Sequence, residues 1–129
     1  MNDPKWILDD VVLAIHSMVL AEHGGAPGIR DSDLLASALG RPKNKLAYDP
    51  AATLFDLAAA YSFAIAKNHP FVDGNKRTAF LCGSLFLELN QIELIASEPD
   101  ATVAFESLAS GNISDSELAE WFKANTRPA

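Results

Sequence analysis

Two long apolar stretches, separated by a short polar segment, constrain the fold of this chain more than any other feature. Apolar side chains occupy nearly every side of a helix over residues 50–67, and again over residues 75–89. A helix that is apolar all round is buried on every face, so we expect these two helices to form the centre of the molecule. The segment between them is dense in polar and charged side chains.

Helical periodicity also covers the first part of the chain. The spacing of apolar residues predicts a helix over residues 7–22, which the glycines that follow it terminate. Asp31 is expected to cap a short second helix that ends at Gly40. The polar residues 41–50 contain two prolines and are interpreted as a surface loop, after which Asp49 and Pro50 start the first buried helix.

Two further helices are expected near the end of the chain. Ser97 opens one of them, and Ser114 with Glu117 forms a capping box for the last. Residues 91–95 are the one weak candidate for a strand. The pattern therefore predicts a single all-α domain over residues 1–129, built around the buried pair of helices.

Composition narrows the class of protein. The chain has 129 residues and a formal net charge of −7, which argues against broad binding to nucleic acid. It has no stretch that could span a bilayer and no signal-peptide pattern, so we expect a cytoplasmic protein. The single cysteine, Cys82, lies in an apolar stretch and is expected in the core. His16 and His23 have no polar neighbours that suggest a site and are expected to be structural or surface residues.

The polar segment between the buried helices carries groups suited to phosphate chemistry. Lys76 and Arg77 fall in the first turn of a helix, where they oppose the helix dipole, and this conflict suggests a bound anion such as a phosphate. Gly74 would let the anion approach the backbone closely. Asp73 could hold Mg²⁺ against that phosphate, and His69 could take a proton from a hydroxyl near neutral pH.

Structural roles for the same residues remain open at this stage. His69 could be a hydrogen-bonded loop histidine, and Asp73 could cap the helix that follows. Asn75 could orient the loop by hydrogen bonds from its side chain to the loop backbone. Lys76 and Arg77 could form a solvated helix face.

The loop resembles the signature of the Fic superfamily, His-x-Phe-x-Asp/Glu-Gly-Asn-x-Arg-x-x-Arg. The matching positions are His69, Phe71, Asp73, Gly74, Asn75 and Arg77. Lys76 and Phe80 depart from the members that transfer AMP, which usually carry glycine and a second arginine there. Both departures resemble the death-on-curing (Doc) branch, and residues 28–31 are also typical of Doc-like chains.

The resemblance implies a Fic/Doc-like helical bundle and a toxin that acts as a protein kinase. Such a protein phosphorylates a threonine of elongation factor Tu with ATP and Mg²⁺ and halts translation. Carried over by position, His69 is the general base and Asp73 holds the metal. The remaining carried-over residues bind the nucleotide: Gly74, Asn75, Lys76 and Arg77, with assistance from Lys67.

Two other functions stay open: AMP transfer on the same fold, and a catalytically silent interaction domain. The intact His69 and Asp73 argue against the silent domain. Lys76 and Phe80 favour phosphoryl transfer over AMP transfer. The resemblance also implies a cognate antitoxin. We expect it to bind across residues 41–49 and the His69 loop.

Overall fold

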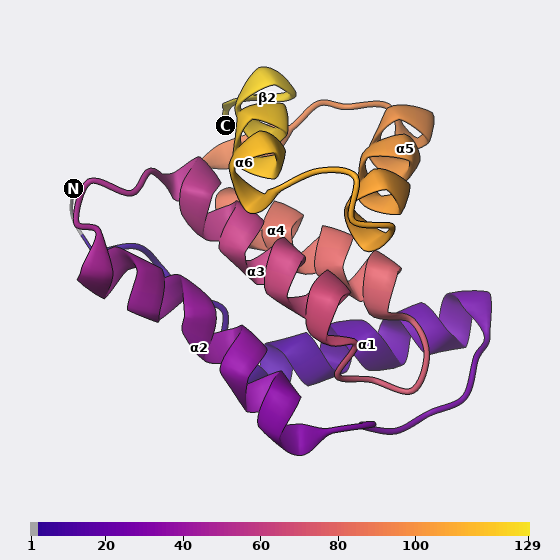
Figure 1. Ribbon diagram of the computed structural model, residues 1–129. Coiled ribbons are helices and arrows are strands. Elements are labelled where there is room, and N and C mark those ends of the chain that lie inside the picture. Colours follow the sequence, from indigo (N-terminus) through magenta and orange to yellow (C-terminus); the bar gives the residue numbers. More distant parts are fainter. Residues whose placement is uncertain (1–2) are drawn as a thin grey trace.

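The computed structural model describes residues 3–129, so the first two residues of the N-terminal segment lie outside it. Six helices and one small sheet make up this described range (Figure 1). In chain order these are α1 (Asp9–His23), α2 (Ser32–Tyr48), α3 (Leu54–Asn68), α4 (Asn75–Leu89), β1 (Ile92–Leu94), α5 (Glu98–Ala109), α6 (Asp115–Ala124) and β2 (Thr126–Pro128). The predicted all-α fold class is confirmed. None of the described helices combines the length and the apolar character needed to cross a membrane.

Helices α3 and α4 form the centre of the molecule, as the sequence predicts. In Figure 1, α3 runs beside α4, with α2 along another side and α6 above. Most of α3 is buried, including a run of alanines that lets its neighbours approach closely. Gly83 allows the same approach from α4, because a Cβ there would lie 2.8 Å from Phe122 Cζ and closer still to Ser62 Oγ. Tight packing of small residues therefore brings three helices together at this point.

Helix α2 is longer than predicted. The expected loop over residues 41–50 is wrong, because the helix continues through Gly40 and Pro42 to Tyr48. An internal proline costs about 3 kcal/mol through its missing N–H and its steric clash. Pro42 is fully buried on the same face of α2 as Leu35 and Ala38. Burial of that face against α3 offsets the local cost, and tertiary packing overrides the sequence signal.

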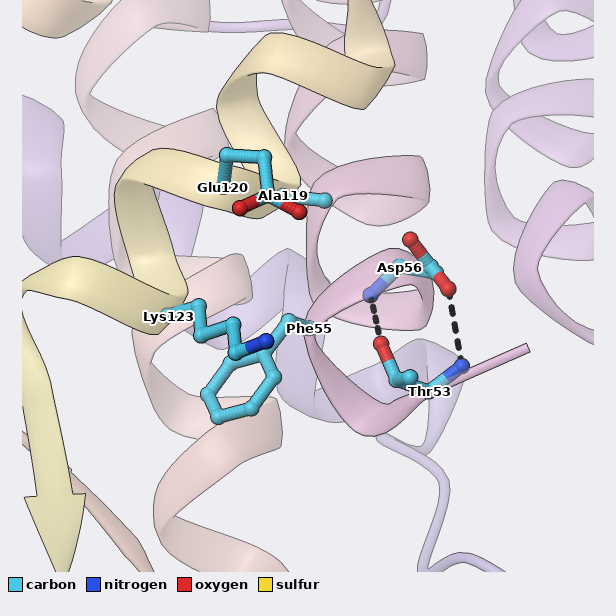
Figure 2. Close-up of a pocket in the computed structure, with 6 residues that line it drawn as sticks. All are labelled: Thr53, Phe55, Asp56, Ala119, Glu120 and Lys123. Carbon is cyan, nitrogen blue, oxygen red and sulfur yellow. Dashed lines mark hydrogen bonds between the residues drawn. The ribbon is translucent and has the colours of Figure 1, made fainter.

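The start of α3 also differs from the prediction. Asp49 and Pro50 do not open the helix; instead Asp49 Oδ1 accepts from the Ala51 N–H at 3.1 Å in a turn. Helix α3 begins at Leu54 behind a capping box, in which Thr53 and Asp56 each accept a hydrogen bond from the other's backbone N–H (Figure 2). This box satisfies two N–H groups that the helix start would otherwise leave unpaired.

The remaining elements largely match the prediction. Helix α4 spans residues 75–89, and α6 begins with the expected capping box of Ser114 and Glu117. The weak strand candidate forms β1, which pairs antiparallel with β2 at the end of the chain. Strand β2 was not predicted. It is three residues long and includes Pro128, so it has no alternating pattern to detect.

Candidate active site

A tight loop connects the end of α3 to the start of α4 and carries most of the predicted site residues. His69 is the C-cap residue of α3 and has left-handed backbone angles, φ 47° and ψ 55°. Gly74 lies at the other end with φ 82°, a value that glycine tolerates best. The side chains of His69 and Asp73 are exposed, whereas Phe71 between them is buried. The loop therefore has an inner side that packs and an outer side open to ligands.

Asn75 holds the inner side of the loop together. Its Oδ1 accepts from the Phe71 N–H at 3.0 Å, and its Nδ2 donates to the Phe71 carbonyl oxygen at 2.9 Å. Both bonds are buried, and they engage both ends of the amide. The structural role considered for Asn75, in which its side chain orients the loop by bonding the loop backbone, is confirmed. The backbone N–H of Asn75, in the first turn of α4, remains available to an anion.

His16 on α1 supports the loop from below. Its ring stacks on Phe71 at a centroid distance of 3.8 Å, and its Nε2 donates to the Asp73 carbonyl oxygen at 2.8 Å. The side chain is buried, which confirms the structural role expected for it. Its polar partner was missed, because Asp73 is 57 residues away in the sequence. His23 is exposed, as expected.

The connection between α1 and α2 lines the other side of the loop. The Arg30 N–H donates to the Pro70 carbonyl oxygen at 2.7 Å, and the Val72 N–H donates to the Gly28 carbonyl oxygen at 3.0 Å. The Arg30 side chain reaches further, with Nε 2.7 Å from the His69 carbonyl oxygen and Nη2 2.7 Å from the Asn68 carbonyl oxygen. Sequence reasoning assigned no role to Arg30.

Asp73 does not cap α4, so that alternative is wrong. The cap position belongs to Gly74, and Asp73 Oδ2 instead accepts from the Ala26 N–H at 2.6 Å. Within residues 3–129, no hydrogen bond reaches its Oδ1. No group of three or more His, Cys, Asp or Glu side chains gathers in that range to hold a metal. One free carboxylate oxygen fits Mg²⁺, which often takes one or two carboxylates and completes its shell with phosphate oxygens and water.

The start of α4 has the features of an anion-binding helix N-terminus. Helices α2, α3, α5 and α6 each have a capping side chain and an acidic residue in the first turn. Helix α4 has neither, and its first turn carries Lys76 and Arg77. Its first backbone N–H groups thus lack a side-chain acceptor, and the positive end of the dipole remains uncompensated. This combination suits a phosphate group.

Acidic side chains of α5 form ion pairs with Lys76 and Arg77 in this structure. Lys76 Nζ lies 2.7 Å from Glu106 Oε1, and Arg77 Nη1 lies 3.8 Å from Glu98 Oε1. All four side chains are substantially exposed, and such pairs contribute about 0–1 kcal/mol. A phosphate can therefore replace the carboxylates at small cost.

Lys67 and Phe80 take different surroundings. Lys67 Nζ lies 5.7 Å from the centre of the Phe63 ring, beside the connection between α5 and α6 at Gly111. In the described range, no hydrogen bond joins it to the His69 loop. Phe80 packs edge-on against Phe105 of α5, with a centroid distance of 4.9 Å. The aromatic residue at this position therefore contributes to the contact between α4 and α5.

Two other features do not belong to the site. The depression in Figure 2 lies between the start of α3 and α6, has a volume of about 150 Å³, and includes no residue of the His69 loop. That volume is below the roughly 300–1,000 Å³ of typical ligand pockets. Cys82 is buried, and this burial raises the pKa of its thiol to about 12. The thiol is therefore an inert core group, as the sequence suggested.

Comparisons with known proteins identify the family of this chain. The family model described as "Fic/DOC family" matches residues 6–87. A protein from Escherichia phage P1 named "Protein kinase doc" is 33% identical over 116 residues, which cover 90% of this chain and 91% of that protein. "Toxin Doc" of Mycolicibacterium smegmatis (strain ATCC 700084 / mc(2)155) is 42% identical over 74 residues, 57% of each chain.

Proposed function

The chain belongs to the Fic/DOC family, and from this premise we propose that it is a Doc-type toxin that acts as a protein kinase. It would transfer a phosphoryl group from ATP to a serine or threonine hydroxyl of a target protein. One observation carries the proposal: an exposed histidine and an uncapped, cationic helix start lie at the two ends of one short, rigid loop. A base and a phosphate site at this spacing suit transfer to a hydroxyl.

Each residue has a role in the proposed transfer. The His69 imidazole accepts the proton of the target hydroxyl while the hydroxyl oxygen forms a bond to the γ-phosphorus of ATP. The bond from that phosphorus to the oxygen bridging to the β-phosphate breaks, and ADP leaves. Lys76, Arg77 and the backbone N–H groups from Gly74 onward would bind the phosphate oxygens. Asp73 would hold Mg²⁺ through its free carboxylate oxygen; the bound ion would neutralise part of the phosphate charge.

The transfer of phosphoryl rather than AMP is favoured by Phe80. Its ring packs against Phe105 of α5, so the second turn of α4 offers an aromatic side chain where AMP-transferring members of the family carry arginine. A second cation to bind the nucleotide in the AMP-transferring orientation is missing at that position. By the same resemblance, we propose elongation factor Tu as the target, with inhibition of translation as the result.

The proposal is tested with ATP labelled at either the α- or the γ-phosphate, together with purified elongation factor Tu. Label transferred from the γ-position only is the expected result. Transfer from the α-position would replace the kinase with an AMP-transferase. No transfer from either position, to elongation factor Tu or to any protein of a cell lysate, would favour the silent domain. His69→Ala should reduce transfer by about 10²–10⁴-fold, the usual contribution of a general base. His23→Ala, at an exposed histidine of α1, is the matched control and should retain full activity.

We also propose a cognate antitoxin, encoded beside this gene, that binds and blocks the toxin. Expression of the chain alone should arrest bacterial growth, and co-expression with the adjacent reading frame should restore it. Arrest should disappear in His69→Ala. Arrest that persists in this variant would show that toxicity does not come from the transfer reaction.

A further inference from the structure

We propose that Arg30 is a positioning residue for His69, holding the backbone of the general base in its left-handed conformation. The inference rests on the proposed function for its catalytic consequence, whereas its structural consequence can be measured without any activity. The guanidinium group bonds the two consecutive carbonyl oxygens of Asn68 and His69, both at 2.7 Å. Two donors of one planar group thereby fix two successive peptide planes.

The conformation of His69 requires such support. Non-glycine residues rarely adopt a φ of 47°, and they retain it only where surrounding contacts hold them. In the described range, no hydrogen bond reaches the His69 ring, so the backbone is what sets the direction in which the side chain leaves the loop. Asn68 and His69 also end α3, where carbonyl groups lack helical partners and the dipole is negative. A cation at this point is favourable on both grounds.

Several contacts besides the Arg30 side chain hold the loop in place. Backbone bonds join Arg30 to Pro70 and Gly28 to Val72, and the Asp31 N–H also donates to the Pro70 carbonyl oxygen at 3.2 Å. Asn75 and His16 hold the inner side independently. Removal of the guanidinium should therefore leave the fold and the start of α4 in place. The change should be confined to the orientation of His69.

The test compares Arg30→Ala with Arg127→Ala, which removes the same charge from an exposed arginine of β2 paired with Glu93. We expect kcat for γ-phosphoryl transfer to fall by about 10- to 100-fold in Arg30→Ala, the scale expected when a reacting group is misplaced by about 1 Å. The Kd for ATP should stay within about twofold of wild type, because the phosphate site on α4 is untouched. Millimolar guanidinium ion should restore part of kcat in Arg30→Ala and none in the control. Arg30→Lys should recover little, since a lysine cannot span both carbonyl groups.

Either of two kinetic results would overturn the inference. One is an unchanged kcat in Arg30→Ala. The other is a joint fall in kcat, ATP affinity and thermal stability without rescue by guanidinium, which would assign Arg30 a purely structural role. NMR separates this inference from the proposed function: φ of His69, from scalar couplings and chemical shifts, should leave the left-handed region in Arg30→Ala and keep it in Arg127→Ala. A left-handed φ in Arg30→Ala would refute positioning, even if the wild-type protein transferred no phosphate.

Discussion

Replacement of Asn75 by alanine tests whether this residue closes the loop or binds phosphate through its side chain. The substitution removes an acceptor 3.0 Å from the Phe71 N–H and a donor 2.9 Å from the Phe71 carbonyl oxygen. Phe71 is 1% exposed and Asn75 is 7% exposed, so water cannot readily replace either partner. Both backbone groups of Phe71 would stay buried and unpaired.

The expected loss of stability is large for one surface-proximal loop. A buried polar group left without a partner costs about 1–3 kcal/mol, and two such groups, with some relaxation of the loop, give about 2–4 kcal/mol. The total stability of a domain of this size is about 5–15 kcal/mol. Since 1 kcal/mol shifts Tm by about 4 °C for a domain of this length, Asn75→Ala should melt roughly 8–16 °C below wild type.

Urea titration followed by circular dichroism measures this loss directly. Asn44→Ala is the matched control, because Asn44 is exposed on α2 and should lose little or gain slightly in helix propensity. A wild-type urea midpoint for Asn75→Ala would refute the role of its side chain in closing the loop. The refutation would be complete if ATP affinity fell in the same variant, since the amide would then act on the nucleotide instead.

Three further predictions concern α4. Lys76→Gln should lower ATP affinity and leave Tm almost unchanged, because its exposed pair with Glu106 contributes about 0–1 kcal/mol; a marked loss of stability with normal affinity would contradict the phosphate role. Gly83→Ala should destabilise the fold by about 1–3 kcal/mol in urea titration, since its Cβ would lie 2.8 Å from Phe122 Cζ. Burial raises the pKa of the Cys82 thiol from 9.0 to about 12, because the charged thiolate is disfavoured in the core. The neutral thiol therefore contributes its full stability to the fold below pH 9, and this contribution is lost as the pH rises toward 12. The urea midpoint of the wild type should fall as the pH rises through this range, and it should fall less steeply in Cys82→Ala. An equal fall in both proteins would show that the Cys82 thiol is not the cause.

The sequence predicted correctly those helix ends that carry a recognisable capping or terminating residue. Asn90 terminates α4 where expected, and Ser114 caps α6 through a box visible in the sequence. The prediction failed at α2, where Gly40 and Pro42 normally end a helix. Their local cost is offset by burial of the Pro42 face against α3. That contact lies between two helices, so no pattern within residues 32–48 alone could reveal it.

The chemistry of the site was visible in the sequence, whereas its support was not. His69 and Asp73 stand within one short motif, so a linear pattern could identify them. His16 and Arg30 act on the same loop from 57 and 39 residues away. A signal for His16 was present, since it lies on the buried face of α1 beside Ile15, where a polar side chain requires a partner. The identity of that partner depends on the fold.

The loop motif divides into two physical classes that the sequence presents as one. Phe71 and Asn75 are buried, whereas His69 and Asp73 are exposed. Selection for a folded loop can maintain the first class without any chemistry. Of the second class, His69 makes no side-chain hydrogen bond in the described range, and Asp73 makes one, to the Ala26 N–H. Buried positions should therefore lose stability and activity together when replaced, and exposed positions should lose activity alone. If His69→Ala and Asp73→Asn melted as far below wild type as Asn75→Ala, the exposed pair would be structural, and the loop would no longer support a transfer reaction.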